Sequence, residues 1–494
     1  MKIKLDNLDS GLYSEFQKKA ADGNISAKDL SELSKIAEKK GVNSDEANFL
    51  KGIADKTNVD KLLKNPKALT KIDLDVDNSN SQDFIKAFNS LSDANKNDFL
   101  NLMNSTTDVP VNENYKKDPF LVQIPKQQID NTYVKKPLYL NKEINNEKIE
   151  TKKQDVLTSS DKAVLEKVLI SGLLTKKDSD GKTVLQNLKE ISGSKKVNGP
   201  KVMKEMINML NPSNIKEVLK LSEKTEFAND KGLKDSNRGI DKKNGIFQKG
   251  VSPTDGLKEI TQCTKRYTCG GASMEVFMKT EAPEQLVKMV KDLVTSGESK
   301  FGNRIIKNPP KSLTTHEGSS VNGKGKEDRT DLDIIIQSAF MDKIGLTSAT
   351  YDIAKDDGGT LTKVFGNGGG SPKPMAHMMQ DLTGKKFDYE HSLDFGLLDV
   401  GLSNLYGIGS AKSNEKLYNI LDKHISKGEK VIIAYNTNPN DKLGLHYVTV
   451  LGKNDKNEYV FLDTDQEKEV GAKLFTMNET EMKNKIRCVI FQKE

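Results

Sequence analysis

Short apolar runs rich in β-branched and aromatic residues gather near the C-terminal end of this chain. They are "EKVIIAYN" (429–436), "LHYVTVLG" (445–452), "EYVFLD" (458–463) and "IRCVIFQ" (486–492). Runs of this length and composition are typical of strands. The periodic segments before them have the helical spacing of apolar residues. Helices followed by strands predict an α+β domain rather than alternating βα units, and we place this domain at 251–494.

Helical patterns also fill the preceding part of the chain. Apolar residues recur at helical spacing in short segments between 11 and 70, at 81–105, and between 159 and 224. From 107 to 154 four prolines interrupt a stretch of little periodicity, which favours an extended linker. The polar, glycine-containing run at 227–245 indicates a further boundary. We therefore expect an N-terminal helical domain at 1–106, an extended linker at 107–154, a second helical region at 155–250 and the α+β domain at 251–494.

Charge and hydropathy exclude several classes of function. The 77 basic and 71 acidic residues leave a net charge of +6 and are interspersed, unlike the concentrated basic footprint of a nucleic-acid-binding protein. No stretch approaches the roughly 20 apolar residues that span a bilayer. The first residues, "MKIKLDNLDSGLYSEF", lack the apolar core of a secretory signal. We expect no nucleic-acid partner, no membrane span, and a protein that is cytoplasmic or is exported without a conventional signal peptide.

Two of the three cysteines lie close together, in "TQCTKRYTCGGASMEVFMKT" (261–280). Zinc clips usually space their ligands by about two to four residues and have a second pair, and Cys263 with Cys269 meets neither condition. We therefore expect no metal and no other cofactor. An odd number of cysteines also suits a reducing compartment better than a disulfide framework.

Cys269 stands at a predicted helix start. Small residues follow it, and Met274, Phe277 and Met278 then recur at helical spacing. At a helix N-terminus the dipole and the backbone N–H groups favour a thiolate, and so lower a thiol pKa that is about 8.5 when free. Gln262 lies upstream and can supply a side-chain donor to an oxyanion. Cys269 is therefore the candidate nucleophile.

A base for this nucleophile lies in a predicted hairpin, "GLHYVTVLGKNDKNEYVFLDTDQ" (444–466). If the "ND" at 454–455 is a two-residue turn, His446 faces Asp463 on the paired strand. Directly opposed residues have Cβ atoms about 4.5–5.5 Å apart, so the carboxylate can hold one imidazole nitrogen while the other accepts the thiol proton. With a loop centred one residue later, Asp465 faces His446 instead.

Other interpretations of the cysteines stay open. Cys263 is a rival nucleophile, because Lys265 and Arg266 can lower its pKa, although no glycine-led helix follows it. Cys488 lies in an alternating strand pattern and is expected in the core. The remaining histidines are scattered singly and lack a comparable pattern of partners: His316, His377, His391 and His424.

These motifs resemble those of the papain-like cysteine peptidases. "QCTKRYTCGGAS", "GLHYVTVLG" and "YVFLD" are most similar to the bacterial branch that includes bacteriocin-leader-processing peptidases, in which Cys-Gly precedes a helix and a His-aromatic-Val strand precedes an Asp strand. The resemblance covers residues 255–494. It implies a papain-like fold with Cys269 as nucleophile, His446 as base, Asp463 as orienting carboxylate and Gln262 as oxyanion donor. Gln262 stands one residue further from the cysteine than in the usual papain pattern, and no proline follows the aspartate.

The expected function is hydrolysis of a peptide or isopeptide bond in a protein or peptide substrate, through an acyl-enzyme on Cys269. The same triad supports glutamine deamidation or transglutamination of a target protein, as in an effector, because a fold does not choose between acyl transfers. A different class is a catalytically inactive interaction protein, in which Cys269 is no more reactive than Cys488. Of the three, the cysteine peptidase is our leading hypothesis.

Overall fold

The computed structural model divides the chain into two compact units. Unit 1 comprises Met1–Asp108 and Lys152–Thr175, and unit 2 comprises Val109–Thr151 and Lys176–Glu494. The expected second helical region at 155–250 is thus divided between the units. The helices expected at 11–70 and most of the expected linker lie outside the residues that the structure describes. These described residues are 78–110, 151–224, 226–229, 240–241, 246–249, 251–262, 268–309, 311–320, 326–344, 351–353, 370–392, 412–436, 445–464 and 471–494.

Unit 1 contains helices that pack around a small aromatic core. The Phe88 ring lies 6.0 Å from the Phe84 ring and 5.5 Å from the Phe99 ring, measured between centroids, and all three side chains are buried. The helical patterns predicted at 81–105 and from 159 are confirmed. The described elements are α6 (Asn78–Asn89), α7 (Asp93–Met103), the paired strands β1 (Thr106–Pro110) and β2 (Thr151–Asp155), α8 (Ser159–Ile170) and the 3-10 helix η2 (Leu173–Thr175).

A six-stranded antiparallel sheet forms the C-terminal part of unit 2. Its strand order is β12-β11-β10-β9-β13-β8. Four of these strands coincide with the apolar runs that predicted them, and β8 and β12 were not predicted. Unit 2 is therefore α+β. The strands are β8 (Phe387–His391), β9 (Val431–Asn436), β10 (Leu445–Lys453), β11 (Tyr459–Asp463), β12 (Lys473–Met477) and β13 (Ile486–Gln492).

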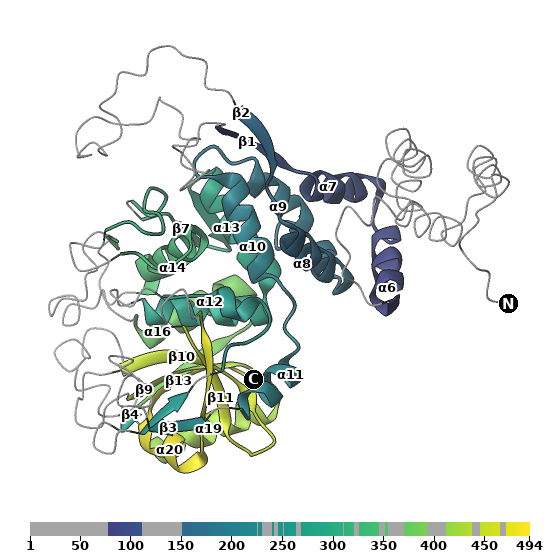
Figure 1. The fold of residues 1–494 in the computed structure, drawn as a ribbon. Helices are drawn as coiled ribbons and strands as arrows, with labels where there is room; N and C mark the ends of the chain where they lie inside the picture. The colour runs from purple at the N-terminus through teal and green to yellow at the C-terminus, as the bar shows by residue number, and fades with distance from the viewer. Residues whose placement is uncertain are drawn as a thin grey trace, which may run out of the picture. The chain divides into compact units, whose positions relative to one another are not determined.

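Helices cover both faces of this sheet (Figure 1). Helix α12 (Cys269–Glu281) and α16 (Pro372–Thr383) lie on one face, and α19 (Asn414–Ser426) lies on the other. Because both faces are covered, β9 and β11 are buried at every position. Helix α12 lies between the sheet and a further layer that includes α13 (Pro283–Thr295) and α14 (Asp331–Ile344). It is the central helix of unit 2.

Smaller elements complete unit 2. The run at 227–245, which we expected to be a boundary, contributes instead to a small three-stranded sheet of order β3-β5-β4. The hairpin of β6 and β7 follows α13. These elements are α9 (Val184–Ser192), α10 (Gly199–Met209), α11 (Ile215–Ser222), β3 (Glu226–Asn229), β4 (Ile240–Asp241), β5 (Ile246–Lys249), the 3-10 helix η3 (Gly256–Glu259), β6 (Glu298–Phe301), β7 (Arg304–Lys307) and α20 (Glu479–Lys485).

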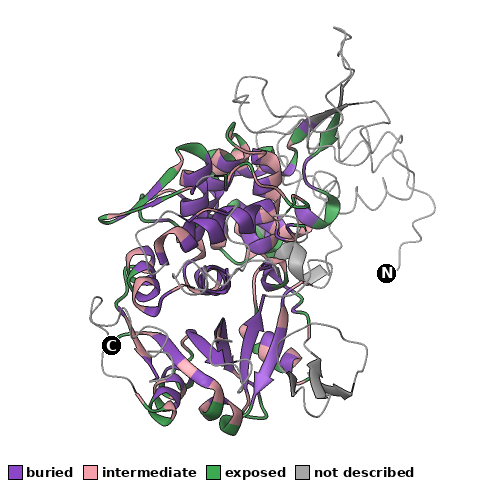
Figure 2. Ribbon diagram, turned by 90° about the vertical axis from the view of Figure 1, so that its left-hand side faces the viewer, coloured by how far each residue is buried: buried purple, intermediate pink, exposed green. Residues whose placement is uncertain are grey.

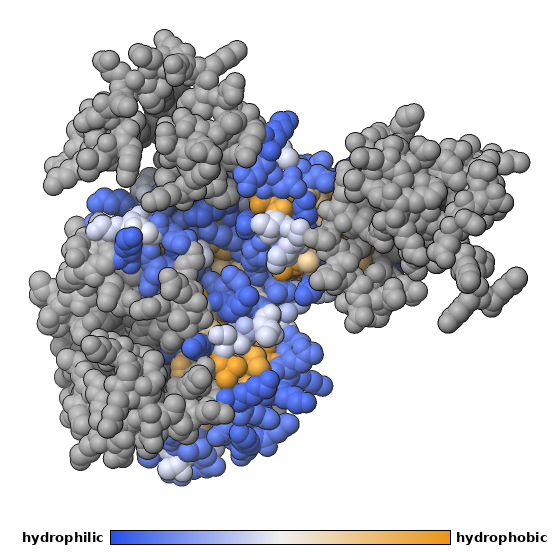
Figure 3. All heavy atoms as spheres, viewed as in Figure 1, coloured by the Kyte–Doolittle hydropathy of each residue, from blue (hydrophilic) through white to orange (hydrophobic). Residues whose placement is uncertain are grey.

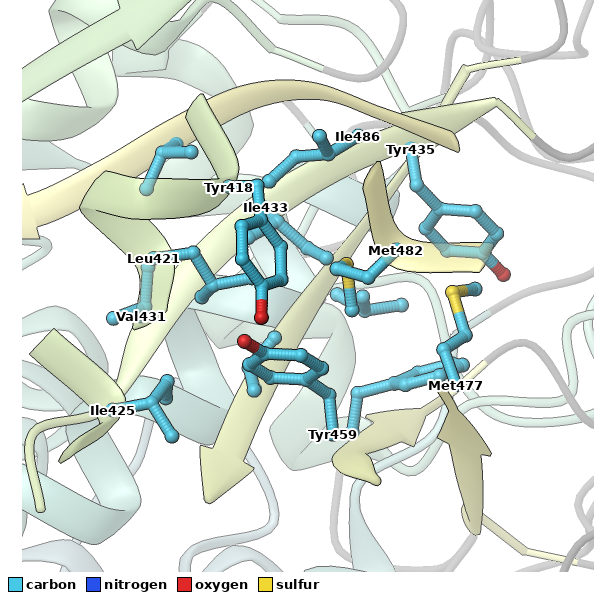
Figure 4. Close-up of a cluster of buried hydrophobic side chains, with 14 of the residues drawn as sticks. Tyr418, Leu421, Ile425, Val431, Ile433, Tyr435, Tyr459, Met477, Met482 and Ile486 are labelled. Carbon is cyan, nitrogen blue, oxygen red and sulfur yellow. The ribbon is translucent and has the colours of Figure 1, made fainter. Parts of the chain in front are cut away.

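The core under α19 is aromatic and aliphatic (Figure 4). Tyr418 of α19 packs edge-on against Tyr459 of β11, with ring centroids 5.8 Å apart. The Tyr459 hydroxyl donates a hydrogen bond of 2.6 Å to Asp422 at the edge of this cluster, so its polar end is satisfied as a buried phenol requires. Figure 2 shows the buried residues running along the strands and the helices beside them.

Hydrophilic side chains dominate the described surface seen in Figure 3, and the hydrophobic ones there form only small areas. Ile305 is the sole large hydrophobic side chain recorded as exposed in the described part of the chain. None of the helices described has the length and apolar composition needed to cross a membrane.

Gly256 lies where η3 approaches α10 so closely that a larger residue would collide with its backbone. A Cβ added there would lie 2.6 Å from the Met209 carbonyl carbon and closer still to its oxygen. We expect Gly256→Ala to lower the free energy of unfolding of unit 2 by about 1–3 kcal/mol, the usual cost of overpacking. Gly193→Ala is the matched control, because its Cβ would meet nothing nearer than 3.7 Å. Urea titrations that report the accessibility of Cys488 in β13 measure both, and equal midpoints for the two variants would contradict the close packing.

Candidate active site

Cys269 is the first residue of α12, as predicted. Its side chain is buried, with 5% exposed. The preceding residue, Thr268, occupies the N-cap position but makes no side-chain cap hydrogen bond. Its hydroxyl donates to Gln337 Oε1 at 3.2 Å. Gly271 allows α12 to approach α14, since a Cβ at this position would lie only 3.1 Å from the Gln337 carbonyl oxygen. The small residues after Cys269 thus serve helix packing.

A direct hydrogen bond fixes α12 against the sheet. The Thr449 hydroxyl of β10 donates to the Ser273 carbonyl of α12 at 2.7 Å. The Ser273 hydroxyl in turn donates to the Cys269 carbonyl at 2.8 Å. Thr449 and Ser273 are both buried, so one turn of α12 after the candidate nucleophile is held at a defined place on β10.

His446 and Asp463 lie together, as the sequence predicts. His446 is near the start of β10 and Asp463 is the last residue of β11. The His446 Nε2 atom lies 3.1 Å from Asp463 Oδ1, and the two side chains are 5% and 1% exposed. Next to a carboxylate this ring nitrogen carries the hydrogen, which leaves the lone pair of a neutral imidazole on Nδ1. The rival carboxylate, Asp465, lies outside the described residues.

The register expected from a two-residue turn at 454–455 was wrong, whereas the pairing of Thr449 with Leu462 is the register of the alternative, in which the loop is centred one residue later. Thr449 pairs with Leu462 and Lys453 with Tyr459, so the loop is longer than a two-residue turn at 454–455. The side chain of Asn454 accepts hydrogen bonds from the backbone N–H groups of Lys456 and Glu458, which closes a wider turn.

The same register explains how the His–Asp pair forms. One step beyond the Thr449 pair, Asp463 lies beside Val448. His446, two residues from Val448, is therefore a diagonal neighbour of Asp463 on the same face of the sheet. Diagonal neighbours remain within reach of each other when their side chains are long.

Gln262 is held at the strand end that carries Asp463. Its backbone N–H donates to the Thr464 carbonyl at 2.8 Å. The side chain is 3% exposed, and its Oε1 atom has no hydrogen-bond partner within the described part of the chain. Which terminal atom is oxygen and which is nitrogen is set by the surrounding hydrogen bonds, so this amide can present either a donor or an acceptor.

Gln337 connects the two ends of the segment between Gln262 and Cys269. Its Nε2 donates to the Thr261 carbonyl at 2.6 Å, and its Oε1 accepts from Thr268 at 3.2 Å. Thr261 and Thr268 therefore lie within the reach of one side chain. Since Gln262 is bonded beside Asp463, the helix end with Cys269 and the strand end with the His446–Asp463 pair lie at the same end of the sheet. Cys263 lies outside the described residues.

Two buried carboxyl groups lie beneath this segment. The hydroxyl of Thr261 donates to Asp333 Oδ2 at 2.9 Å. Burial raises the pKa of Asp333 to about 6. Burial, together with the neighbouring negative charge of Asp333, raises the pKa of Glu275 well above its usual range. Neither group was predicted from the sequence, although Glu275, an acid between Met274 and Val276, was a visible signal.

The other described cysteine is not reactive by its surroundings, and His316, which we expected to lack a partner, lies with Nδ1 3.2 Å from Asp331 Oδ2; its side chain is 40% exposed, unlike that of His446. Cys488 of β13 pairs with His391 of β8, but burial and then the negative charge of Glu390 raise the pKa of Cys488 far above neutrality. Cys488 is thus a core thiol, as predicted. His424 bonds Glu429 through Nδ1 at 2.5 Å and packs against Phe491, which is a structural role.

No protein-family model matches the chain, and no curated protein matches it.

Stability should depend on the ionisation of Asp333. Its pKa is raised from 3.8 to about 6 in the folded state, so the folded chain binds this proton more tightly than the unfolded chain. The contribution to stability is therefore complete below about pH 4 and is lost as the pH rises through 6. Asp333→Asn imitates the protonated form at every pH.

The free energy of unfolding of Asp333→Asn, relative to the wild type, should therefore rise by on the order of 2 kcal/mol between about pH 4 and pH 7. Urea titrations followed by circular dichroism at both pH values measure this difference. If the free energy of unfolding of Asp333→Asn relative to the wild type is the same at both pH values, or falls between pH 4 and pH 7, the raised pKa of Asp333 is contradicted.

Proposed function

We propose that residues 251–494 form a papain-like cysteine hydrolase domain that cleaves a peptide or isopeptide bond in a protein substrate. Cys269 is the nucleophile, His446 the base and Asp463 the carboxylate that orients the base. The observation that carries the proposal is the buried His446–Asp463 pair at 3.1 Å, which lies at the same end of the sheet as the first residue of α12. A buried imidazole held by a carboxylate, near a thiol at a helix start, is the arrangement that activates a cysteine.

The proposed reaction begins with a proton transfer. With Nε2 bonded to Asp463, the Nδ1 atom of His446 accepts the proton of the Cys269 thiol. The resulting thiolate is stabilised by the imidazolium and by the positive end of the α12 dipole. Asp463 keeps the ring in the required tautomer and stabilises its charged form.

Acyl transfer then proceeds in two steps. The Cys269 sulfur attacks the substrate carbonyl carbon, and the tetrahedral intermediate collapses to a thioester as His446 gives its proton to the leaving amine. A water molecule, deprotonated by His446, attacks the thioester, and the acid product leaves as the thiol is regenerated. The backbone N–H of Cys269 and the side-chain amide of Gln262 are the proposed donors to the oxyanion. The position of Gln262 beside the strand end that carries Asp463, where its backbone N–H donates to the Thr464 carbonyl, supports this role.

The reactivity of the thiols provides the first test. We expect iodoacetamide to label Cys269 at a pH well below the ordinary thiol pKa of about 8.5, and we expect His446→Ala to abolish this early labelling because the imidazolium is lost. Mass spectrometry of native protein across a pH series reads each cysteine separately.

Cys488 is the internal control, since the folded protein should protect it until urea is added. Early labelling of Cys263 in place of Cys269 would transfer the role to the rival cysteine. Equal, slow labelling of Cys269 and Cys488 would favour an inactive interaction protein.

Hydrolysis itself can be tested without a known substrate. Wild-type protein incubated with a proteome-derived peptide library should create new peptide termini, and Cys269→Ala should create none, because no other group in the proposal forms the acyl-enzyme. Mass spectrometry counts the new termini in each sample. The small mass gain of an amide-to-acid conversion at glutamine, without new termini, would replace the peptidase proposal with deamidation.

A further inference from the structure

Gln337 is a fully buried amide in the middle of α14, whose neighbouring residues are mostly apolar. We propose that Gln337 is a positioning residue of the active site, which sets the oxyanion donor Gln262 and the nucleophile Cys269 at a fixed separation. This inference rests on the proposed function. It adds a residue that belongs to neither the triad nor the oxyanion donors and comes from a helix on the far side of α12 from the sheet.

The Gln337 amide has its full set of hydrogen bonds. Nε2 donates to the Thr261 carbonyl at 2.6 Å and to Glu275 Oε2 at 2.8 Å. Oε1 accepts from the Thr268 hydroxyl at 3.2 Å and from Arg329 Nη1 at 3.3 Å. An amide can donate twice and accept twice in this way.

The partners also fix which way the amide points. In the flipped orientation Oε1 would face the Thr261 carbonyl, and the NH₂ group would face the guanidinium of Arg329. Both contacts would be repulsive, so only one orientation satisfies the site. The Gln337 side chain therefore imposes a single geometry on the groups that it joins.

These bonds fall next to the two residues whose placement the reaction requires. Thr261 directly precedes Gln262, and Thr268 directly precedes Cys269. The backbone N–H and the hydroxyl of Thr261 also bond Asp333, at 3.3 and 2.9 Å, so Thr261 is held through three of its polar groups. Gln262 is then tied to Thr464 on its other side. Gln337 thus holds both ends of the segment from 262 to 268.

Gln337 is itself held rigidly. Arg329 forms a two-pronged pair with Glu327, in which Nε lies 2.8 Å from Oε1 and Nη2 lies 3.0 Å from Oε2. Both side chains of this pair are completely buried. The pairing neutralises the guanidinium and leaves its Nη1 directed at Gln337.

Burying such a polar network carries a large desolvation cost, and well-packed apolar residues of similar volume often stabilise a core as well or better. Networks of this kind are also cooperative and geometrically specific. A network whose bonds adjoin the nucleophile and the oxyanion donor is therefore better explained by positioning than by stability alone. Displacement of a reacting group by about 1 Å can reduce a rate on the order of 100-fold.

The test compares three variants by the iodoacetamide labelling of Cys269 across a pH series. Gln337→Met keeps the length of the side chain and removes all four hydrogen bonds. Thr268→Val keeps the shape of its residue and removes only the bond next to Cys269. Ser338→Ala is the matched control, because Ser338 is buried on the same helix and its hydroxyl has no hydrogen-bond partner in the described chain.

We expect Gln337→Met to slow the labelling of Cys269 by about 10- to 100-fold and to move its pH midpoint toward that of an ordinary thiol. Thr268→Val should give a smaller change in the same direction, and Ser338→Ala should match the wild type. Protection of Cys488 in each native variant shows that the core is intact, so a fall in stability alone would not produce this pattern.

The positioning role alone would be overturned if Gln337→Met and Thr268→Val both label Cys269 at the wild-type rate and with the wild-type pH midpoint. In that outcome the early labelling of Cys269 still depends on His446. If Gln337→Met does not fold, Thr268→Val decides the question by the same criterion. Absence of early labelling in the wild type, or its persistence in His446→Ala, would overturn the proposed function and the positioning role together.

Discussion

The burial of α12 is the constraint on which the rest of unit 2 depends. Every residue from Cys269 to Lys279 is buried, so this helix has no solvent face for its polar side chains. Glu275 therefore takes its hydrogen-bond partner from inside the protein, where Gln337 donates to its Oε2 atom. Lys279 donates to the Asn211 carbonyl at 3.1 Å, and burial lowers its pKa to about 8. The sheet, α13, α14 and α16 are arranged around a helix that is fixed at several points along its length.

The sheet separates the groups that the proposed reaction must bring together. Thr449 points toward α12, whereas Val448 and Val450 belong to the cluster under α19. His446 shares the side of the strand with Val448, and its ring contacts Tyr435 edge-on at 5.8 Å. The imidazole can therefore meet a group on α12 only around the end of β10. The position of His446 near the first residue of that strand is thus a geometric requirement of the proposal.

The sequence was sufficient for the features that depend on local patterns. Apolar runs located β9, β10, β11 and β13 because their composition suits a sheet covered on both faces. The glycine-led start of α12 followed from helical spacing after Cys269. The hairpin loop was predicted too short, because the wider turn depends on side-chain bonds of Asn454 that a residue pattern does not contain.

The Gln337 network could not be derived in this way. Its members lie on separate segments of the chain, and in the sequence Gln337 is one polar residue within an apolar helix. Only packing decides whether such a residue faces a neighbour or solvent. The close contact between Gly271 and the Gln337 backbone is equally invisible before α12 and α14 are placed together. Long-range polar contacts were thus the part of the site that sequence reasoning missed.

The place of β13 in the sheet has a consequence for the order in which the protein forms during synthesis. β13 lies between β9 and β8, although it follows both in the chain. When β8 leaves the ribosome, it has no partner in the sheet until β13 has been made. Pairing over such distances in sequence is slow, so the complete sheet, with the proposed base His446, forms well after Cys269 has been synthesised. The nascent chain therefore passes through a period in which the thiol of Cys269 is present without the His446–Asp463 pair that we propose activates it.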